Sequence, residues 1–421
     1  MRGNLERKGA GVRRAPRTIL LTEDAPAYGV LAALRALSAA EYVPWLAVTG
    51  AGSYGERSRS AHGITRVPDP AANADAYAHA LAEVAERIGA SAVLPGTENA
   101  LLALTEREHL FRNAAVGTSS AASLKRALDK EELARLASEA GLNAPPTIVV
   151  ERAELQRRAA ELRYPAIVKP PRTRMPGKDG VLRHGGARWV GSAAELLASA
   201  DSLPGERWLV QAYLSGDLVA VCGVAWKGRV VCRIHQIAHR ISPPLCGGSS
   251  YAATIAPDRE LDNGVERLVE LLAWSGVFQV QFVRTLERSY VIDFNPRIYG
   301  TLALAVAAGL NLPDVWASLV LGATPSVNGY RVGVHFRSEE KDGLALLAAL
   351  AQRDWRSALA GLVPRRRTVH AAFSLRDPLP LATSIAKLGR TREVLRQALS
   401  AGRPDRRERG RRSAAFPPKR P

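Results

Sequence analysis

Cysteine is scarce in this sequence of 421 residues, and its arrangement excludes two common kinds of site. The three cysteines, Cys222, Cys232 and Cys246, are odd in number and have no C-x-x-C spacing, so they predict neither a disulfide framework nor a zinc site. A chain without structural disulfides suits a reducing compartment, and we expect a cytoplasmic protein.

Long hydrophobic runs are missing as well. The longest apolar stretch, residues 302–321, is interrupted by Asn311, Pro313 and Asp314 and falls short of membrane-spanning length. No apolar segment of the signal-peptide type follows the basic N-terminus. The sequence therefore predicts a soluble protein that does not use a membrane.

Several motifs of common enzyme classes are also absent. No G-x-G-x-x-G follows the first apolar strand, so the fingerprint of a dinucleotide site is missing. A G-x-S-x-G elbow, an H-E-x-x-H helix and a Walker A loop are missing too. The sequence therefore gives no indication of NAD, of a serine nucleophile, of a zinc protease or of a P-loop.

Positive charge is abundant, with a net charge of +18, but it is concentrated at the ends of the chain. Residues 1–17, 365–402 and 403–421 carry +5, +6 and +6, which leaves +1 for residues 18–364. The two terminal segments have little to bury and are predicted to be disordered. A solvated tail explains them more simply than a nucleic-acid site, so we do not expect nucleic acid as a partner.

The chain from Thr18 alternates short apolar runs with helical stretches. We expect strands at residues 18–22, 44–49 and 92–94, and helices at 27–40 and 74–88. Strands separated by helices pair in parallel, so residues 18–122 predict a Rossmann-like α/β domain. Ligands of such sheets bind at the carboxyl ends of strands, where this chain has polar groups at residues 22–24 and 95–98.

A helix with a defined beginning and end follows this domain. Asp129 is its expected N-cap, Glu132 stands at the position of a capping box, and Gly141 closes it. From Thr147 to about residue 300 strands dominate, often in antiparallel-looking pairs. We therefore place a second domain at residues 123–326 and a small C-terminal region at 327–402.

The most informative stretch is residues 277–297, which reads as two strands joined by a short turn. Its apolar faces match if Gln281 lies opposite Asp293 and Phe282 opposite Ile292. Gln281, Asp293 and Asn295 then offer three oxygen donors on one face, the ligand type that Mg²⁺ prefers. Arg297 adds a positive charge on the same side. An amphipathic hairpin with a solvated polar face is the alternative.

This segment resembles the metal-binding segment of the ATP-grasp superfamily, in the branch of carbamoyl phosphate synthetase and the carboxylate–amine ligases. The resemblance lies in the runs 280–282, 291–297 and 309–313. It implies an α/β (α+β ATP-grasp) fold, with a two-lobed ATP-grasp domain behind the Rossmann-like domain. It also implies that Gln281, Asp293 and Asn295 are magnesium ligands and that Arg297 is the catalytic arginine near the transferred phosphoryl group. The family usually has Glu where this chain has Asp293.

Further matches follow in the family's order. The resemblance implies that Lys130 and Lys169 contact the ATP phosphates and that the glycine-rich loop at residues 175–186 covers them. The run at residues 208–217 resembles the hinge that packs the adenine, which implies nucleotide contacts by Gln211, Ala212, Tyr213, Leu214 and Asp217.

The sequence indicates the residues that bind the acid substrate less clearly than those that bind ATP. Arg240 lies where carboxylate–amine ligases commonly bind their acid, with Arg233, His235 and His239 as nearby alternatives. A lone arginine in a loop is more often structural, and both interpretations stay open.

The resemblance implies an ATP-dependent ligase that joins a small carboxylate to an amine (or thiol) through an acyl phosphate and releases ADP and phosphate. Its cofactors would be ATP and Mg²⁺, with Mn²⁺ as an alternative, and a homodimer is compatible with it. An enzyme of the carbamoyl phosphate synthetase or carboxylase type, using bicarbonate, is the main alternative. The chain has no recognisable glutaminase or biotin-carrier motif to favour it. A non-catalytic nucleotide- or nucleic-acid-binding protein is the alternative of another class.

Overall fold

The computed structural model describes residues 17–177, 179–200, 203, 205–243, 245–351, 355 and 366–389. The two segments predicted to be disordered, 1–17 and 403–421, lie outside the described residues except for Arg17. No helix in the described ranges is both long and apolar enough to cross a membrane.

The N-terminal part is a five-stranded parallel sheet in the order β3-β2-β1-β4-β5. Its strands are β1 (Thr18–Glu23), β2 (Val43–Val48), β3 (Gly63–Arg66), β4 (Ala92–Leu94) and β5 (Ala115–Val116). Its helices are α1 (Tyr28–Ala39), α2 (Ala74–Arg87) and α3 (Glu98–Thr105). The predicted parallel sheet is confirmed, and the strand order reverses between β1 and β4, where the polar groups at residues 22–24 and 95–98 meet. Asp24 accepts hydrogen bonds there from Thr97 and Asn99.

Two helices connect this sheet to the rest of the chain, α4 (Ala121–Leu128) and α5 (Lys130–Glu139). The predicted N-cap is confirmed, because Asp129 accepts from the amides of residues 131 and 132. The capping box is not completed, since Glu132 binds Arg126 and Arg135 instead of the cap amide. Gly141 follows the helix with φ of +76°, as expected for a closing glycine.

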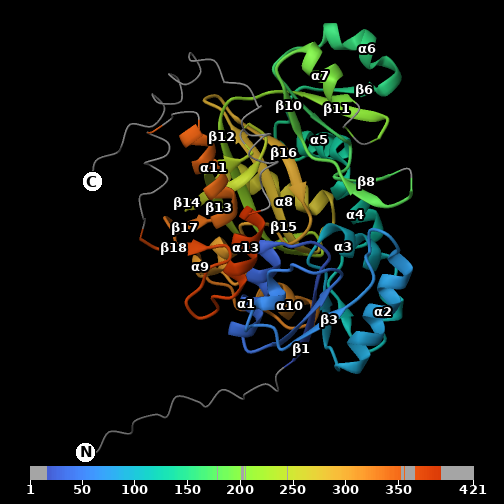
Figure 1. The fold of residues 1–421 in the computed structure, drawn as a ribbon, viewed down its shortest axis with the longest axis vertical. Helices are drawn as coiled ribbons and strands as arrows, with labels where there is room; N and C mark the ends of the chain where they lie inside the picture. Colours follow the sequence, from blue (N-terminus) through green and yellow to red (C-terminus); the bar gives the residue numbers. More distant parts are fainter. Residues whose placement is uncertain are drawn as a thin grey trace, which may run out of the picture.

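A small lobe follows, with a four-stranded antiparallel sheet in the order β10-β7-β11-β6. Its strands are β6 (Thr147–Glu151), β7 (Ala166–Lys169), β10 (Arg188–Val190) and β11 (Arg207–Ala212), and its helices are α6 (Leu155–Arg158) and α7 (Ala193–Ser199). A separate hairpin of β8 (Arg174–Pro176) and β9 (Leu182–His184) extends from it. This lobe has a hydrophobic core of its own around Trp208, and it stands apart from the N-terminal sheet in Figure 1.

The centre of the molecule is a seven-stranded sheet in the order β16-β15-β12-β13-β14-β17-β18. Its strands are β12 (Asp217–Trp226), β13 (Arg229–Ser242), β14 (Gly248–Ile255), β15 (Gly276–Arg284), β16 (Ser289–Asn295), β17 (His335–Arg337) and β18 (Thr368–His370). The remaining helices are α8 (Arg259–Leu271), α9 (Leu302–Ala307), α10 (Leu312–Val320), α11 (Glu339–Ala351) and α13 (Pro380–Gly389).

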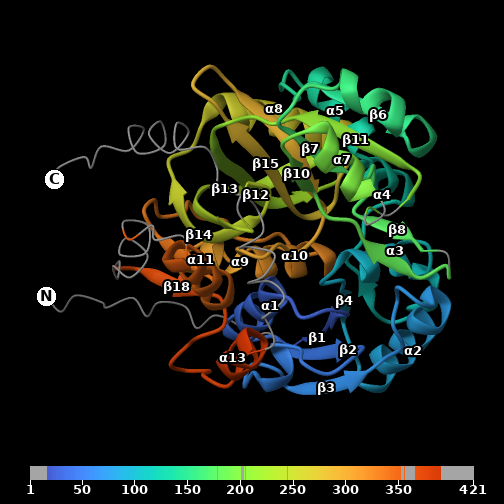
Figure 2. The same cartoon turned by 45° about the horizontal axis from the view of Figure 1, so that its top comes forward.

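Both faces of β12 are buried, which explains why this strand is apolar at nearly every position. On β12, Val219 and Val221 pack into a core formed with α4, α5 and α8, whereas Ala220 and Cys222 face the opposite side. The core on that opposite side continues through α9 and α10 to α1 and the N-terminal sheet. The central sheet and the N-terminal domain therefore share one core, and Figure 2 shows α10 and α1 between them.

Candidate active site

The hairpin of β15 and β16 has the predicted register at Gln281 and Asp293. Gln281 lies opposite Asp293, as expected, but Phe282 lies opposite Val291 and not Ile292. A β-bulge between these pairs removes Ile292 from the ladder and places Val291 in the core. The sequence prediction was wrong here because Val291 and Ile292 are both β-branched and apolar, so the alternation of residue types does not distinguish them.

The polar face of this hairpin brings amide and carboxylate oxygens together. Asn295 lies directly opposite Gln279 and donates from Nδ2 to the Oε1 atoms of Gln279 and Gln281, both at 3.3 Å. Gln279 was not among the predicted site residues, although it alternates with apolar residues in the same way as Gln281. The face therefore offers oxygens from three amide side chains and from Asp293.

Lys130 connects this face to the beginning of α5. Its Nζ donates to Oδ1 of Asp293 at 3.1 Å and to Oγ1 of Thr173 at 3.1 Å. The capped first turn of α5 fixes the lysine backbone, while its side chain is largely buried at 11% exposure. A lysine and an aspartate that are 163 residues apart thus form one ion pair in the site.

Lys169 approaches the same hairpin from the end of β7. Its Nζ donates to the backbone carbonyl of Ile292 at 2.9 Å and to Oε1 of Gln211 at 3.2 Å. Ile292 lies at the bulge and outside the ladder, on the edge strand of the sheet, so its carbonyl is free to accept this bond. Burial lowers the pKa of Lys169 to about 8, and the charge of Lys130 contributes to this lowering. Within the part of the chain that the structure describes, this desolvated lysine donates to an amide oxygen and a carbonyl oxygen and to no carboxylate.

Arg297 follows β16 and lies at the boundary with the N-terminal domain. Its NH2 donates to Oδ1 of Asn295 at 3.4 Å, and its Nε lies 3.7 Å from Oε2 of Glu98. Glu98 begins α3 and is only 3% exposed, and its buried Oε1 has no hydrogen-bond partner among the described residues. Burial raises the pKa of this carboxyl, although Arg297 and Lys130 oppose the effect.

Glu98 is the main residue of this cluster that the sequence did not predict. Its only signal was a polar group at the carboxyl end of an expected strand, residues 95–98. The sequence does not predict its contact with Arg297, because that contact joins two domains.

The predicted hinge residues lie on and just after β11. Gln211 is buried, and its Nε2 donates to Oγ1 of Thr147 at 3.0 Å. The amide of Ala212 donates to the carbonyl of Pro146, and that of Tyr213 donates to the carbonyl of Pro165. Leu214 follows without regular structure, and Asp217 begins β12. The segment is thus anchored beside Lys169 through Gln211, and its contacts with a nucleotide stay a prediction.

The predicted covering loop is the β8–β9 hairpin. Its Leu182 amide donates to the carbonyl of Ala71 at 3.0 Å, so the hairpin contacts the N-terminal domain. His184 lies within the electrostatic range of the site, because desolvation and the charges of Arg174, Arg297 and Lys130 lower its pKa. The described part of this loop is therefore bound to the N-terminal domain, and its role as a cover of the site stays a prediction.

The predicted substrate residue Arg240 is engaged elsewhere. Its Nε and NH2 donate to the two oxygens of Asp342 at 2.6 and 2.9 Å, and its guanidinium lies 4.7 Å from the ring centre of Tyr251. Of the alternatives, His235 and Arg233 both pair with Asp262 on α8, and His239 lies beside Tyr251. A substrate role for Arg240 stays a prediction that would require sharing this arginine with Asp342.

Four cations and two carboxylates therefore lie close enough to one another to interact electrostatically. Lys130, Lys169, Arg174 and Arg297 stand against Asp293 and Glu98. An excess of positive charge with embedded oxygen donors suits a polyphosphate with a divalent cation.

Comparison with known proteins agrees with this geometry. A family model described as "ATP-grasp in the biosynthetic pathway with Ter operon" matches residues 205–341. An L-amino acid ligase from Bacillus licheniformis has a similar structure, with a TM-score of 0.57 and 13% identity over 73% of this chain and 75% of that one.

Two further solved structures are similar. A biotin carboxylase from Campylobacter jejuni gives a TM-score of 0.56 and 18% identity, over 76% of this chain and 74% of that one. An N5-carboxyaminoimidazole synthetase from Staphylococcus aureus gives 0.54 and 15%, over 74% and 78%. The predicted α/β fold class is confirmed. The expected resemblance to ATP-grasp proteins agrees with the family model over residues 205–341, and the chain shares the fold of these solved structures.

Proposed function

We propose that this protein is an ATP- and Mg²⁺-dependent ligase that activates a small carboxylic acid as an acyl phosphate and joins it to an amine. The observation that carries the proposal is the convergence of Lys130, Lys169 and Arg297 on the oxygen donors of β15 and β16. Of the similar structures, the amino acid ligase has a name that fits this reaction.

The lysines would hold the phosphates of ATP. Lys169 is fixed at the end of β7 and is desolvated. A bound phosphate would place a negative charge in direct contact with its ammonium group. Lys130 would donate to a phosphate oxygen in place of one of its present contacts. Its backbone would not have to move, because α5 holds it.

The donor set of the hairpin fits Mg²⁺. Asp293 supplies a carboxylate, and Gln281 and Asn295 supply amide oxygens, with Gln279 beside them. No cluster of three or more His, Cys, Asp or Glu side chains is found within the described residues, which fits a hard cation held mainly by phosphate oxygens and water. Bound there, the cation would neutralise charge on the transferred group.

The proposed reaction has two steps. A carboxylate oxygen of the acid attacks the γ-phosphorus of ATP, the bond to the bridging oxygen breaks, and ADP leaves. The amine nitrogen then attacks the acyl carbon, and phosphate leaves with the electrons of the C–O bond. Arg297 would stabilise the negative charge on the phosphoryl group in the transition state of its transfer. The β8–β9 hairpin would exclude water from the acyl phosphate. No side chain needs to form a covalent intermediate.

The test is ADP formation by the full-length protein with a panel of amino acids, small dicarboxylic acids and bicarbonate. We expect ADP and phosphate to form only with the correct acid, and hydroxylamine to capture the activated acid as a hydroxamate. AMP and pyrophosphate in equal amounts would mean adenylation, and bicarbonate as the only active acid would indicate the carboxylase alternative.

A further inference from the structure

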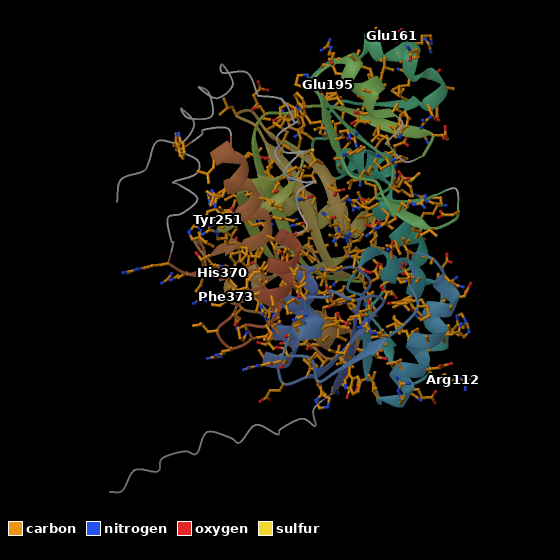
Figure 3. The ribbon with its side chains drawn as sticks, viewed as in Figure 1. Arg112, Glu161, Glu195, Tyr251, His370 and Phe373 are labelled. Atoms are coloured by element: carbon orange, nitrogen blue, oxygen red, sulfur yellow. The ribbon has the colours of Figure 1, made fainter. Side chains whose placement is uncertain are left out.

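Helix α3 begins at the carboxyl end of β4, and its first turn is fixed by the loop that follows β1. Asp24 in that loop accepts from Oγ1 of Thr97, the N-cap of α3, and from Nδ2 of Asn99 at 2.7 Å. In Figure 3, Glu195 marks the small lobe and Arg112 the outer end of the N-terminal domain, and α3, labelled in the same view in Figure 1, lies between them. The first turn of α3 is therefore a fixed part of the N-terminal domain on the side towards the small lobe.

This turn carries two buried acceptor oxygens that are unpaired within the described chain. Oε1 of Glu98 and Oδ1 of Asn99 have no hydrogen-bond partner among the residues that the structure describes, and the two residues are 3% and 5% exposed. The orientation of the Asn99 amide is fixed, because its nitrogen faces the carboxylate of Asp24. A buried acceptor without a donor costs about 1–3 kcal/mol. The turn therefore suits a ligand that brings N–H or O–H groups.

Glu98 lies next to the arginine that we place at the transferred phosphoryl group. Its Oε2 is 3.7 Å from Nε of Arg297, whose NH1 and NH2 donate to the carbonyl of Ile298 and to Oδ1 of Asn295. Oε2 therefore faces a cation, and Oε1 is the oxygen that remains unpaired in the described chain. In an acyl phosphate only one oxygen separates the phosphorus from the acyl carbon. A carboxylate beside Arg297 is thus close to the carbon that the amine must attack.

Only one of the three reactants can donate to this oxygen with its reacting group. The γ-phosphate of ATP and the carboxylate of the acid are ionised at neutral pH and can only accept hydrogen bonds. The amine carries N–H groups and arrives mostly as an ammonium ion. An unpaired carboxylate oxygen beside the phosphoryl site therefore fits the amine and fits neither ATP nor the acid.

We propose that Glu98 binds the amine substrate and accepts a proton from it before the amine attacks the acyl phosphate. The proposal rests on the ligase function proposed above and assigns a residue to its second step. One N–H bond of the ammonium ion breaks and the proton passes to Oε1, which leaves the electron pair on nitrogen for the acyl carbon. Phosphate leaves with the electrons of the C–O bond and takes the second proton from nitrogen. Glu98 then returns its own proton to water.

The surroundings of Glu98 favour this transfer. Burial raises the pKa of its carboxyl although Arg297 opposes the effect, so the carboxylate is a stronger base than an exposed one. Arg297 also disfavours a second cation beside it, so an ammonium ion that binds there loses its proton more readily. The N-terminal domain supplies the base and the hairpin supplies the arginine, so the amine reacts where these two parts meet.

The first experiment compares the amine with hydroxylamine in Glu98→Gln, which keeps the shape of the side chain and removes its charge. Hydroxylamine is mostly uncharged at neutral pH and needs no base before it attacks the same acyl phosphate. We expect the ratio of kcat/KM for the amine to kcat/KM for hydroxylamine to fall about 100-fold or more, as for a lost general base. An effect through Arg297 or through the fold would lower both reactions and leave the ratio unchanged, which would overturn the proposal.

Two further variants complete this test. Glu98→Asp keeps a carboxylate but shortens it, so the ratio should fall several-fold and less than in Glu98→Gln. If Glu98→Gln does not fold, Glu98→Asp decides the question, because an unchanged ratio there refutes a direct contact with the amine. The matched control is Glu106→Gln, which alters an exposed glutamate at the other end of α3 and should behave as wild type.

A second readout does not require the acid to be known. The melting temperature of the full-length protein with Mg-ADP is measured with a panel of amino acid amides, which carry an amine in place of the ligated group, and with their N-acetyl derivatives, which do not. At least one amide should raise the melting temperature of wild type by a few degrees, and neither its N-acetyl derivative nor Glu98→Gln should show the effect. Equal melting temperatures with and without every amide would mean that solvent satisfies Oε1, and the amine site would be refuted.

Failure of the two proposals can be distinguished. If no acid supports ADP formation, the ligase function fails, while the melting temperatures still test the amine site. If the hydroxamate forms and the ratio in Glu98→Gln equals that of wild type, only the role of Glu98 fails.

Discussion

Replacement of Lys169 by methionine tests the proposed phosphate site most directly. This lysine is 7% exposed, and without a ligand the desolvation of its ammonium group destabilises the folded state. Methionine is similar in length and has no charge. The change removes the contacts to Gln211 and to the carbonyl of Ile292 but leaves the apolar part of the side chain. We expect weaker ATP binding together with a folded state that is no less stable.

The magnitudes follow from the pKa and from the type of contact. Lowering the pKa from 10.5 to about 8 corresponds to roughly 3 kcal/mol, at about 1.4 kcal/mol per pKa unit. Because the folded-state pKa is the lower one, this destabilisation is fully present below about pH 8 and disappears as the pH rises towards 10.5. A charge-assisted phosphate contact contributes about 1.5–3 kcal/mol, so ATP affinity should fall roughly 10- to 150-fold.

Titration calorimetry of Mg-ATP between pH 7 and 9 measures both effects. Wild-type affinity should fall as the pH passes 8, because the lysine loses its proton, and binding near pH 8 should take up a proton. Lys169→Met should lose this pH dependence, and its unfolding midpoint at pH 7 without nucleotide should equal or exceed that of the wild type. Lys227→Met, at an exposed turn, is the control. Unchanged ATP affinity in folded Lys169→Met would refute the reasoning.

Two other predictions concern the metal and the ends of the chain. Asp293→Asn should abolish turnover and leave the circular dichroism spectrum unchanged, because the site loses its only proposed carboxylate ligand; normal ADP release would remove Asp293 from the metal site. A truncated chain of residues 18–402 should keep full ATP-dependent activity, since the basic ends lie outside the proposed site, and loss of activity in a well-folded truncated protein would favour a partner that binds the basic ends.

The sequence predicted those features of the fold that leave a periodic signal. The strands at residues 18–22, 44–49 and 92–94 and their helices were recovered because buried parallel strands are apolar throughout and their crossovers are amphipathic. The short edge strands β3 and β5 were missed. β3 is only half buried and alternates weakly, and β5 has two residues, so neither carries enough pattern to be recognised.

The sequence predicted which types of residue form the candidate site better than it predicted which of them contact one another. Alternation along the hairpin placed Gln281 opposite Asp293, but the bulge at Ile292 depends on the packing of Val291, which a sequence pattern does not encode. The ion pair of Lys130 with Asp293 and the approach of Glu98 to Arg297 join distant segments. The sequence suggested that Arg240 binds substrate, but the structure pairs it with Asp342. That residue lies in the C-terminal region, for which the sequence predicted no function.

The separate hydrophobic core of the small lobe has a consequence for how nucleotide could enter. Lys169 and the hinge after β11 belong to that lobe, whereas Asp293 and Arg297 belong to the body formed by the central sheet and the N-terminal domain. Regions with separate cores can open independently at a lower free energy than global unfolding. Bound nucleotide would join the two parts as a non-covalent cross-link, so amide hydrogen exchange in β6, β7, β10 and β11 should slow on binding more than exchange in the central strands.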